Sequence, residues 1–390
     1  MLTFKNFAGI NNVVPSHRLK TTELTTATDV DVGLTGELKR RDGYSELDAT
    51  CHKNLWQADG FLLATVAGND LKAFTAGGAY TTVSASLGTA RVWYCNLPDG
   101  RTTFTNGLIN GITGGGAAVG WGVPVPGSLG AIADVAGALF PGDYQYQLTY
   151  VRLSDGLESG PLYSNPTTIT SGGIALTGLP TLAGHTINVY ITGANGGAAF
   201  YAGNTATSSF TFTGANDALV LPCRTENLSP APVGTVTAFW RGRVLVAVGS
   251  VMWASMAGRW QHFNMRRDFK QFSANITLIQ PVDNGVFVGT EDELCFLAGT
   301  EFDKLSYKPV VAGRVVLGSG VAVRGELLQQ REGSGLGSAM VCIADRVITA
   351  GFSDGQIVRM TEGRYVTDVT EVSATFRMVD RVPQYVAIPQ

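Results

Sequence analysis

The chain contains 390 residues, of which only 15% are charged and 49 are glycine, and its formal net charge is −3. This slightly acidic balance excludes the large basic surface that nucleic-acid recognition usually requires. Many glycines and β-branched residues with little charge favour short strands and tight turns over amphipathic helices. We therefore expect an all-β protein, long enough for two domains or one large domain with a sizeable core.

Residues 1–44 begin as a polar arm with few large apolar side chains and no clean strand alternation. Two alternatives are open for this arm: it lies across an adjoining subunit, or it packs on its own chain. The basic group KRR at 39–41 is expected to be solvated, with contact to a partner or to DNA phosphates as the alternative.

Hairpin patterns, each a β-rich run, a short polar turn and a second β-rich run, recur along the chain. They occur at 60–74, 242–255, 285–299 and 345–360, with a looser copy at 100–112. The positions Asn54 and Arg91 are 37 residues apart, and Val236 and Ile276 are 40 apart. Periods near 40 with antiparallel strands are typical of a β-propeller, so we predict a propeller of five or more blades.

The segment 124–222 interrupts this pattern. Between residues 143 and 150 Tyr or Leu alternates with polar residues, as in a half-buried strand. Further strand-like runs occur at 174–176, 186–192, 198–203 and 208–213. About seven short strands predict an inserted β-sandwich, and the absence of a Cys…Trp…Cys arrangement favours a fibronectin-like or generic immunoglobulin-like type.

The predicted organisation therefore has four parts, which are an N-terminal arm with the first propeller strand at 1–44, the first part of the propeller at 45–123, the inserted sandwich at 124–222 and the second part of the propeller at 223–390. Residues 375–389 are strand-like almost to the end of the chain. We expect this strand to close the propeller by completing a blade that the other end begins, which removes exposed edges.

The cysteines give no sign of a metal site or a disulfide scaffold. They are odd in number and widely spaced, at Cys51, Cys95, Cys223, Cys295 and Cys342. Without a CxxC or Cys/His cluster, zinc is not expected. Cys95, Cys295 and Cys342 lie in apolar runs and are predicted to be buried thiols. The chain opens without a signal-peptide pattern and has no run of 18 apolar residues, so we expect synthesis in a reducing cytoplasm and no membrane span.

Motifs that carry chemistry are few. The acidic turn at Glu291, Asp292 and Glu293 could bind a metal, but adjacent carboxylates on one turn rarely converge on an ion, so we expect a solvated turn. The glycine-rich segments 333–337 and 111–120 lack the strand and helix context of a nucleophile elbow or a dinucleotide site, and the second is expected to be a linker. The four histidines, His17, His52, His185 and His262, occur in unrelated contexts.

Glycoside hydrolysis is the one enzymatic activity that we consider, because it requires only two carboxyl groups about 5–10 Å apart. Asp155 with Glu158, or Asp354 with Glu362, are the candidates. Most such acids cap turns, so we predict no catalytic, cofactor-binding or metal-binding residues and no enzymatic activity, and a hydrolase ranks third among the possible functions.

Aromatic residues gather between positions 239 and 272. This group consists of Phe239, Trp240, Trp253, Trp260, Phe263, Phe269 and Phe272. We expect most of them to fill spaces between blades, with a ligand platform or a subunit interface as the alternatives. The basic group MRRDFK at 265–270 is also expected to be solvated, with contact to a partner or to DNA phosphates as the alternative.

The N-terminal segment resembles the opening of many phage virion proteins, in which F-x-G-I/L-N leads to A-x-N-V/D-V-D and then to G-x-L-x-x-R-x-G-Y/F. The matching positions are Phe7, Gly9, Ile10, Asn11, Asp29, Val30, Asp31, Gly36, Leu38, Arg41, Gly43 and Tyr44. The chain departs from the commonest form at Thr28 and Asp29. Later phrases of these proteins are matched in order at 101–112, 121–127, 142–161 and 188–203, although Ile191 stands where a basic residue is usual.

This resemblance implies the tail hub or nozzle class of short-tailed phages, similar to the packaged-DNA stabilization proteins. In that class, propeller-bearing subunits, typically six, form a ring below the portal and adaptor. The ring extends the DNA channel, lets double-stranded DNA pass without specific contacts and helps to retain the genome until ejection. The implied location is the virion tail. The alternative function is a carbohydrate- or receptor-binding tail module that uses the inserted sandwich.

Overall fold

The computed structural model describes residues 7–33, 36–41, 43, 45, 50–66, 69–74, 80–328, 337–379 and 382–390. Within these residues, the only helices are short 3-10 turns, namely η1 (Ser16–Arg18), η2 (Asn216–Ala218), η3 (Phe302–Lys304) and η4 (Gly325–Leu327). No helix in the described part of the chain has the length and hydropathy to cross a bilayer. The regular structure is otherwise β-strand, which confirms the all-β prediction.

Outside the insertion, successive antiparallel sheets follow the chain, and we call them blades 1 to 6. Blade 1 contains β5 (His52–Gln57), β6 (Leu62–Val66), β7 (Asp70–Phe74) and β8 (Tyr80–Ser84), and blade 2 contains β9 (Trp93–Asn96), β10 (Thr102–Thr105) and β11 (Asn110–Thr113). Blade 3 contains β21 (Thr237–Trp240), β22 (Arg243–Val248), β23 (Val251–Met256), β24 (Arg259–Phe263) and β25 (Phe269–Gln271). Blade 4 contains β26 (Ile276–Val282), β27 (Gly285–Thr290), β28 (Glu293–Ala298) and β29 (Ser306–Ala312). Blade 5 contains β30 (Val321–Arg324), β31 (Ser338–Ala344), β32 (Val347–Phe352) and β33 (Ile357–Arg359), and blade 6 is the hairpin of β34 (Val372–Val379) and β35 (Val382–Pro389).

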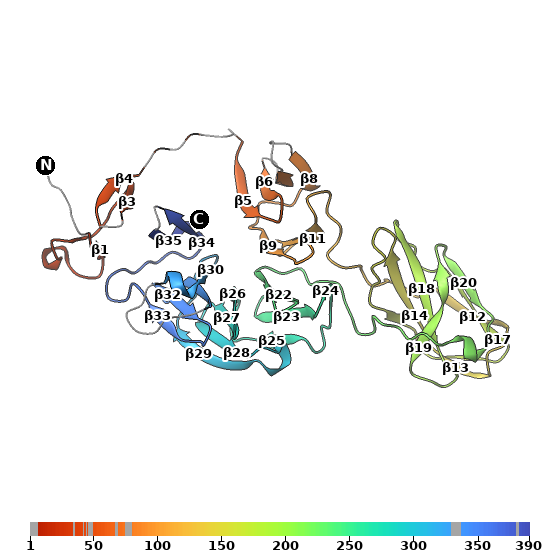
Figure 1. Cartoon of the computed structure of the whole chain (residues 1–390). Helices are drawn as coiled ribbons and strands as arrows, with labels where there is room; N and C mark the ends of the chain where they lie inside the picture. The colour runs from red at the N-terminus through yellow and green to blue at the C-terminus, as the bar shows by residue number, and fades with distance from the viewer. Residues whose placement is uncertain are drawn as a thin grey trace.

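The first strands of neighbouring blades lie beside one another. From blade 2 to blade 6, β9 contacts β21, β21 contacts β26, β26 contacts β30, and β30 contacts β34. Blades 1 and 2 are joined through Asn54, which accepts a hydrogen bond from the Val92 amide at 3.1 Å and one from the Tyr94 hydroxyl at 2.9 Å. Figure 1 shows the blades following one another from β5 to β35. Antiparallel sheets, three of them four-stranded, that follow one another in this way form a β-propeller, as the sequence predicted.

The spaces between blades hold the apolar core, and β27 shows how one strand serves two of them. Successive side chains of a strand point to opposite faces. Val286 and Val288 pack in the cluster shared with blade 3, and Phe287 packs with Met340 of blade 5. All three β27 side chains are fully buried. Blade 4, which has a neighbouring blade on each side, is thus covered on both faces.

The predicted hairpins are confirmed. The pattern at 285–299 forms β27 and β28, which pair from Gly285 opposite Ala298 to Gly289 opposite Leu294. The patterns at 60–74, 100–112, 242–255 and 345–360 form β6–β7, β10–β11, β22–β23 and β32–β33. Each of these pairs is antiparallel, as a short polar turn between two β-rich runs requires.

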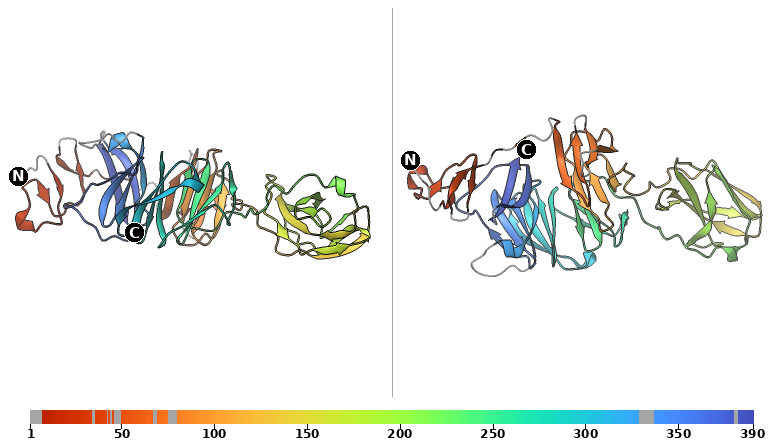
Figure 2. Two further views of the ribbon diagram at one scale, coloured as in Figure 1. Left: turned by 90° about the horizontal axis from the view of Figure 1, so that it is seen from below. Right: turned by 45° about the horizontal axis from the view of Figure 1, so that its top comes forward.

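The inserted unit follows the third strand of blade 2. Its strands are β12 (Ala131–Ala136), β13 (Gly142–Tyr144), β14 (Tyr146–Arg152), β15 (Leu162–Tyr163), β16 (Thr167–Ile169), β17 (Gly172–Thr177), β18 (His185–Thr192), β19 (Ala199–Thr205) and β20 (Ser209–Phe212). One sheet has the order β15-β14-β18-β19 and another the order β12-β17-β20. Residues of both sheets share one buried cluster, with Leu148 and Val189 from the first and Ile174 and Leu176 from the second. Figure 2 shows this unit standing apart from the blades.

The face of β14 that sequence alternation predicts to be polar is buried as well. Tyr144, Tyr146 and Leu148 enter the core as expected, but Gln147 is only 4% exposed and Thr149 is fully buried. The prediction of a half-buried strand is therefore wrong. The physical reason is that Thr149 belongs to a hydrogen-bonded network on the outer face of this sheet, which is described below.

The two chain ends do not close the propeller in the expected way. Among the described residues, β34 and β35 pair only with each other, and the terminal strands β3 (Val30–Val32) and β4 (Leu38–Arg40) form a separate hairpin. The short strands β1 (Gly9–Ile10) and β2 (Glu23–Leu24) pair in parallel.

Side chains connect the ends instead. Asn12 donates to the Val366 carbonyl at 2.8 Å and accepts from its amide at 3.0 Å. Arg377 of β34 lies 3.6 Å from Asp31 of β3. An amide side chain carries the same donor and acceptor as a peptide group, so Asn12 replaces one pair of backbone bonds. The described part of the arm thus packs on its own chain.

Candidate functional site

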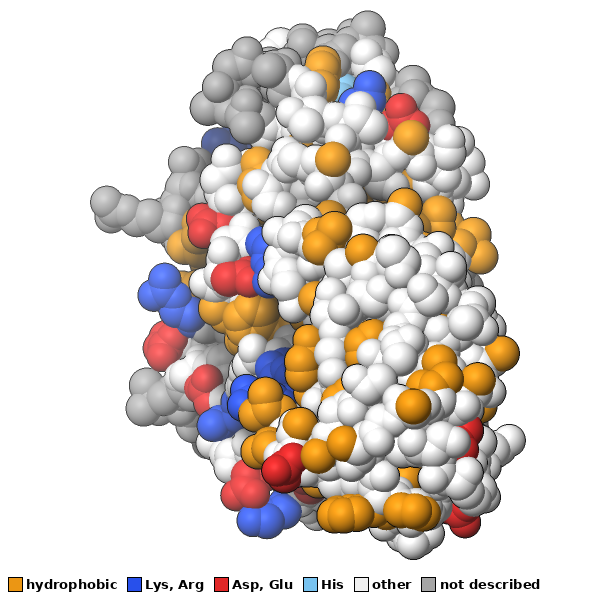
Figure 3. Space-filling view, turned by 90° about the vertical axis from the view of Figure 1, so that its right-hand side faces the viewer, with side chains coloured by type: hydrophobic (Ala, Val, Ile, Leu, Met, Phe, Trp, Pro, Cys, Tyr) orange, Lys and Arg blue, Asp and Glu red, His pale blue; other side chains and the backbone are white. Residues whose placement is uncertain are grey.

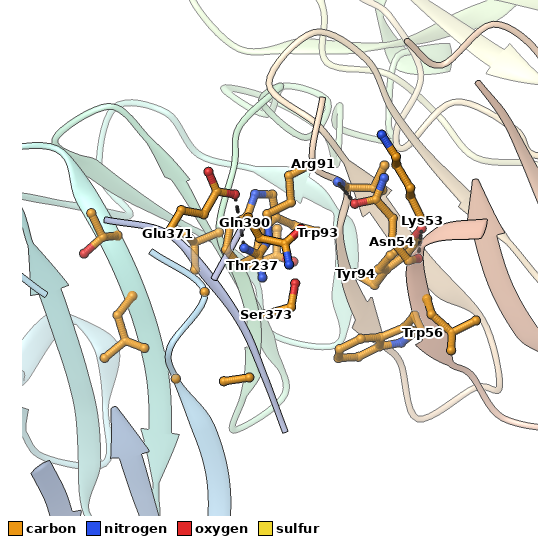
Figure 4. Close-up of a pocket in the computed structure, with 18 of the residues that line it drawn as sticks. Lys53, Asn54, Trp56, Arg91, Trp93, Tyr94, Thr237, Glu371, Ser373 and Gln390 are labelled. Atoms are coloured by element: carbon orange, nitrogen blue, oxygen red, sulfur yellow. Dashed lines mark hydrogen bonds and ion pairs between the residues drawn. The ribbon is translucent and has the colours of Figure 1, made fainter. Parts of the chain in front are cut away.

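The first strands of the blades surround a cavity of about 740 Å³. Its walls come from β5, β9, β21, β26 and β34 and from the segment that leads into β30, so strands of five blades contribute. We call it the axial cavity. Figure 4 shows part of its lining, with Trp56 extending from β5 toward the side where Ser373 lies. Its volume falls in the range of about 300–1,000 Å³ that is usual for small-molecule sites.

Arg91 joins two distant parts of the chain across this cavity. Its Nη1 donates to the Val372 carbonyl at 2.7 Å and to Glu371 Oε1 at 3.2 Å. The guanidinium also lies over the Trp93 ring, 4.5 Å from the ring centroid. Because Arg91 precedes blade 2 and Glu371 precedes blade 6, this contact links the early and late blades in place of a shared strand.

Trp56 forms an aromatic wall of the cavity. Its ring is stacked on Tyr94 with centroids 5.7 Å apart, and its indole nitrogen donates to Asn96 at 2.8 Å. Both contacts fix the orientation of the ring, yet Trp56 remains 37% exposed. A held but partly exposed aromatic side chain offers a flat apolar surface to a ligand.

Several polar side chains of the lining have no partner among the described residues. The buried hydroxyls of Thr237 and Thr277 are unpaired. The side chains of Gln280, Ser373 and Lys53 also line the cavity, and no interaction of theirs is found within the described part of the chain. Unpaired polar groups at a cavity wall are costly unless water or a ligand completes their hydrogen bonds.

A second region of interest is the junction, where the inserted unit meets blade 3. The Trp121 indole donates to the Trp260 carbonyl at 2.9 Å, and Arg152 donates to the Gly120 carbonyl at 2.9 Å. The His262 ring nitrogen Nε2 donates to the Glu158 carbonyl at 2.7 Å. Glu158 thus joins the inserted unit to β24, Arg152 joins it to the segment that precedes it, and Trp121 holds that segment on blade 3.

The Glu158 carboxylate organises the outer face of the β14–β18–β19 sheet. Its Oε1 accepts hydrogen bonds from Thr149, from Asn188 at 2.9 Å and from the Tyr190 hydroxyl at 2.6 Å. Burial and the neighbouring Glu158 charge raise the pKa of Tyr190 far above its usual value. Burial lowers the pKa of His262 below its usual 6.5. Burial at the junction therefore favours the neutral form of the His262 ring.

The carboxylate pairs considered for glycoside hydrolysis have structural partners. Asp155 binds Arg152 through both oxygens, at 3.0 and 2.7 Å, and these bonds lower its pKa. Glu158 holds the network above. Asp354 accepts the Gln356 amide in a turn, and Glu362 pairs with Arg359 at 3.0 Å.

The acidic turn between β27 and β28 in blade 4 is mostly exposed to solvent, as expected from the sequence. Glu291 and Asp292 are exposed, and Glu293 accepts a hydrogen bond from the Tyr307 hydroxyl. Across the described ranges, no group of three His, Cys, Asp or Glu residues is placed to hold a metal ion.

The glycine-rich segment 111–120 is more than a linker. Its first residues are the last residues of β11. Ile112 of that strand forms an antiparallel bridge with Val119, which lies at the position of a fourth strand of blade 2. The Ala118 amide donates to the Val83 carbonyl of blade 1 at 2.8 Å. Residues 333–336, part of the other glycine-rich stretch, and Tyr44 of the N-terminal phrase lie outside the described residues.

The aromatic group mostly fills the spaces inside and between blades, as expected. Trp240 and Phe272 belong to the cluster shared by blades 3 and 4, and Phe263 is fully buried with Phe239, Trp253 and Trp260 packed around it. Phe269 is the exception and is 40% exposed. Cys95, Cys295 and Cys342 are buried as predicted, and burial raises the pKa of each thiol to about 12.

The basic groups differ from one another. Arg41 of the first group is exposed and pairs with Asp29 at 3.4 Å. In the second group, Arg267 binds the fully buried Asp268 at 2.9 Å, and Arg243 lies 3.6 Å from the same carboxylate. Asp268 is thus a buried anion that requires these cations.

Sequence reasoning missed the axial cavity and the contacts of the junction. Arg91 and Glu371 lie in no motif, and the residues that Arg91 bonds are 280 and 281 positions away. Trp121 opens one of the virion-like phrases, but nothing local marks its bond to Trp260, 139 positions away. Trp56 has a weak signal, as a large aromatic residue at the end of a polar strand HKNLWQ. Such a strand, apolar on neither face, is unusual for a blade and could have indicated a cavity wall.

The fold defines the chain as a β-propeller protein with an inserted β unit. No family model and no curated protein sequence matches it. Among solved structures, BamB from Moraxella catarrhalis is 12% identical with a TM-score of 0.35, over 94% of this chain and 92% of that one. The Neurospora crassa Pan2 WD40 domain is 8% identical with a TM-score of 0.32, over 87% and 86%. BBS1N in complex with ARL6DN is 9% identical with a TM-score of 0.32, over 87% and 93%. These scores are low, so the propeller assignment rests on the strand order of this chain.

Proposed function

We propose that this protein is a structural subunit of a phage tail, of the hub or nozzle class. In this proposal several copies, six by the resemblance, form a homo-oligomeric ring that joins the portal, the adaptor and other tail proteins. The ring extends the DNA channel and helps to retain the packaged genome until ejection. The inserted unit is proposed to be an immunoglobulin- or fibronectin-like sandwich, with its two sheets facing across one core.

The observation that carries this proposal is where the virion-like phrases lie in the fold. In the phrase at 101–112, Thr105 donates to the Gly234 carbonyl at 2.6 Å and Asn106 donates to the Leu87 carbonyl at 2.7 Å, which ties blade 2 to both neighbours. The phrase at 121–127 begins with the junction residue Trp121, and the phrase at 142–161 contains Arg152 and Glu158. The resemblance thus concerns the residues that build the joins of this two-part architecture.

A subunit of two parts joined by hydrogen bonds suits a ring whose function is geometric. The blades and the inserted unit are connected by hydrogen bonds at several points, so both can contact neighbours in a fixed relation. The net charge of −3 is compatible with a lumen along which DNA passes without tight binding.

The test is the assembly state of the full chain, alone and with a purified portal–adaptor complex. Light scattering and negative-stain images should show a ring, with six copies of the 41.1-kDa chain as the expected mass, that docks on the adaptor. A protein that stays monomeric and never joins the portal–adaptor complex contradicts the proposal.

A second candidate is a carbohydrate- or receptor-binding tail module that uses the inserted unit. The projecting position of this unit favours it, as does its surface, which is largely uncharged on the face shown in Figure 3. Residues 124–222 contain five acidic residues, one arginine and no lysine. Adsorption of the purified protein to host cells that is lost when 124–222 is deleted, with the blades still folded by circular dichroism, would support this function over the ring.

A further inference from the structure

The axial cavity combines three features on the blades themselves, apart from the ring and from the inserted unit. It has a fixed aromatic wall at Trp56, unpaired hydroxyl and amide groups on several other strands, and a volume of about 740 Å³. We propose that this cavity binds a neutral saccharide, with one sugar ring against Trp56 and its hydroxyls bonded to Gln280, Ser373 and the neighbouring threonines.

The charge of the lining favours an uncharged ligand. Arg91 and Glu371 neutralise each other, and the Val372 carbonyl occupies the same Arg91 nitrogen. Lys53 is the one remaining cation among the described lining residues without a counter-ion, and it is an exposed side chain. An anionic ligand such as a phosphate usually requires several converging cations or amide groups, which this wall does not supply.

The hydrogen-bonding groups favour a ligand rich in hydroxyls. A threonine or serine hydroxyl both donates and accepts, and a glutamine amide offers donors and an acceptor in one plane. Thr237, Thr277 and Gln280 lie on the adjacent strands β21 and β26, and Ser373 lies on β34. A sugar presents hydroxyls of the same dual character around its rim, so each can pair with these groups.

The aromatic wall accounts for the other surface of a sugar. The faces of a pyranose ring carry C–H groups and are the apolar part of the molecule. Trp56 presents a flat ring whose polar nitrogen is already bonded to Asn96, so it offers apolar contact without an unmet donor. This division, with apolar contact on one face and hydrogen bonds at the rim, distinguishes a saccharide from an extended peptide, which needs a row of backbone partners.

The experiment uses saturation-transfer NMR and calorimetry on the full chain. The probes are glucose, galactose, N-acetylglucosamine, lactose, maltose and chitobiose, with inorganic phosphate as the anionic comparison. We expect at least one saccharide to bind with a Kd of about 1 mM or tighter, and no binding of phosphate. Failure of every saccharide, or binding of phosphate alone, overturns the proposal.

Variants locate the site. Trp56→Ala, Gln280→Ala and Ser373→Ala are each expected to weaken saccharide binding about threefold to tenfold, the effect of losing one hydrogen bond or stacking contact. Gln280→Ala and Ser373→Ala keep the test valid if Trp56→Ala does not fold. The matched controls, Phe269→Ala and Gln356→Ala, remove an exposed aromatic and an exposed amide outside the cavity and should leave the affinity unchanged. Saccharide binding that survives the Trp56→Ala and Gln280→Ala changes together would place it elsewhere and refute the assignment.

Discussion

The blades and the inserted unit achieve stability in different ways. Blade 4 buries apolar side chains on both faces, because Val286 and Phe287 pack against different neighbouring blades. The inserted unit has one apolar core between its sheets and a polar network on an outer face, centred on Glu158. The blades therefore depend on one another through apolar contacts, whereas the inserted unit is a separate core seated on the blades through hydrogen bonds.

This difference predicts two separable unfolding transitions, each sensitive to its own core. Phe287→Ala removes a fully buried ring, 4.7 Å from the Phe296 ring centroid, and should lower the stability of the propeller by about 3–5 kcal/mol. Leu148→Ala empties a fully buried position of the inserted unit and should lower the stability of that unit by about 2–5 kcal/mol. Urea denaturation followed by circular dichroism measures both.

The matched control for these variants is Phe269→Ala, which removes a 40% exposed ring and should cost about 1 kcal/mol or less. If Phe287→Ala and Leu148→Ala shift one common transition equally, the two cores are not independent, and the contrast between blades and insertion fails.

The polar network gives the next largest effect. Glu158→Ala leaves the Tyr190 hydroxyl and the Asn188 amide without their acceptor, and the cost should be about 1–3 kcal/mol on the transition of the inserted unit. Limited proteolysis near residues 120–123 and 222–230 should also become faster in this variant, because the network supports the junction between the inserted unit and blade 3. Glu362→Ala, which removes an exposed carboxylate from a surface ion pair, is the matched control and should change neither measurement.

The sequence predicted the features that depend on neighbouring residues. The polar turn between two β-rich runs in 285–299 specifies the β27–β28 hairpin, and the apolar residues of both runs, among them Val286, Val288, Leu294 and Phe296, are buried. The strands of 124–222 were found in the same way. Such patterns are local, because strand period and turn chemistry act over fewer than about 15 residues.

The features that failed depend on distant residues. Thr149 is buried because Glu158 and Tyr190 cover the outer face of β14, which alternation cannot show. The propeller is joined by Arg91 to Glu371, across 280 positions, where a shared closing strand was predicted. The axial cavity likewise needs five strands and the segment before β30, taken from the whole chain, so no single motif could mark it.

The Arg91 contact provides a smaller test of how the blades are held together. Arg91→Ala removes bonds to Glu371 and to the Val372 carbonyl. Both charged side chains are partly exposed, which screens the pair, so we expect a loss of about 1 kcal/mol in the propeller transition and none in that of the inserted unit. Arg41→Ala, at an exposed ion pair with Asp29, is the control with no expected loss. An unchanged propeller transition in Arg91→Ala would show that this link does not stabilise the closure.

The smallest expected effect is a pH dependence confined to the junction. Burial holds the pKa of His262 below its usual 6.5, with Arg259 lowering it further and the Glu158 carbonyl and carboxylate acting in the opposite direction. Folding therefore favours the neutral ring. Its contribution to stability is fully present above pH 6.5 and is lost as the pH falls from 6.5 through the lower pKa of the folded state. Asp155, whose pKa is lowered from 3.8 by Arg152, keeps its own contribution until the pH falls below 3.8, so the two windows are separate.

The measurement is proteolysis at the junction between pH 7.5 and 5, where the wild-type protein should become more sensitive as the pH falls. His262→Gln keeps an N–H donor near the Glu158 carbonyl and cannot be protonated, so this variant should lose the pH dependence. The same change at His185, whose Nδ1 donates to the Ala183 carbonyl at 2.9 Å within the inserted unit, should retain it. Equal acid sensitivity in His262→Gln and the wild-type protein would mean that the junction is held by its other bonds, those of Trp121 and Arg152, and that the polar seat does not respond to protonation.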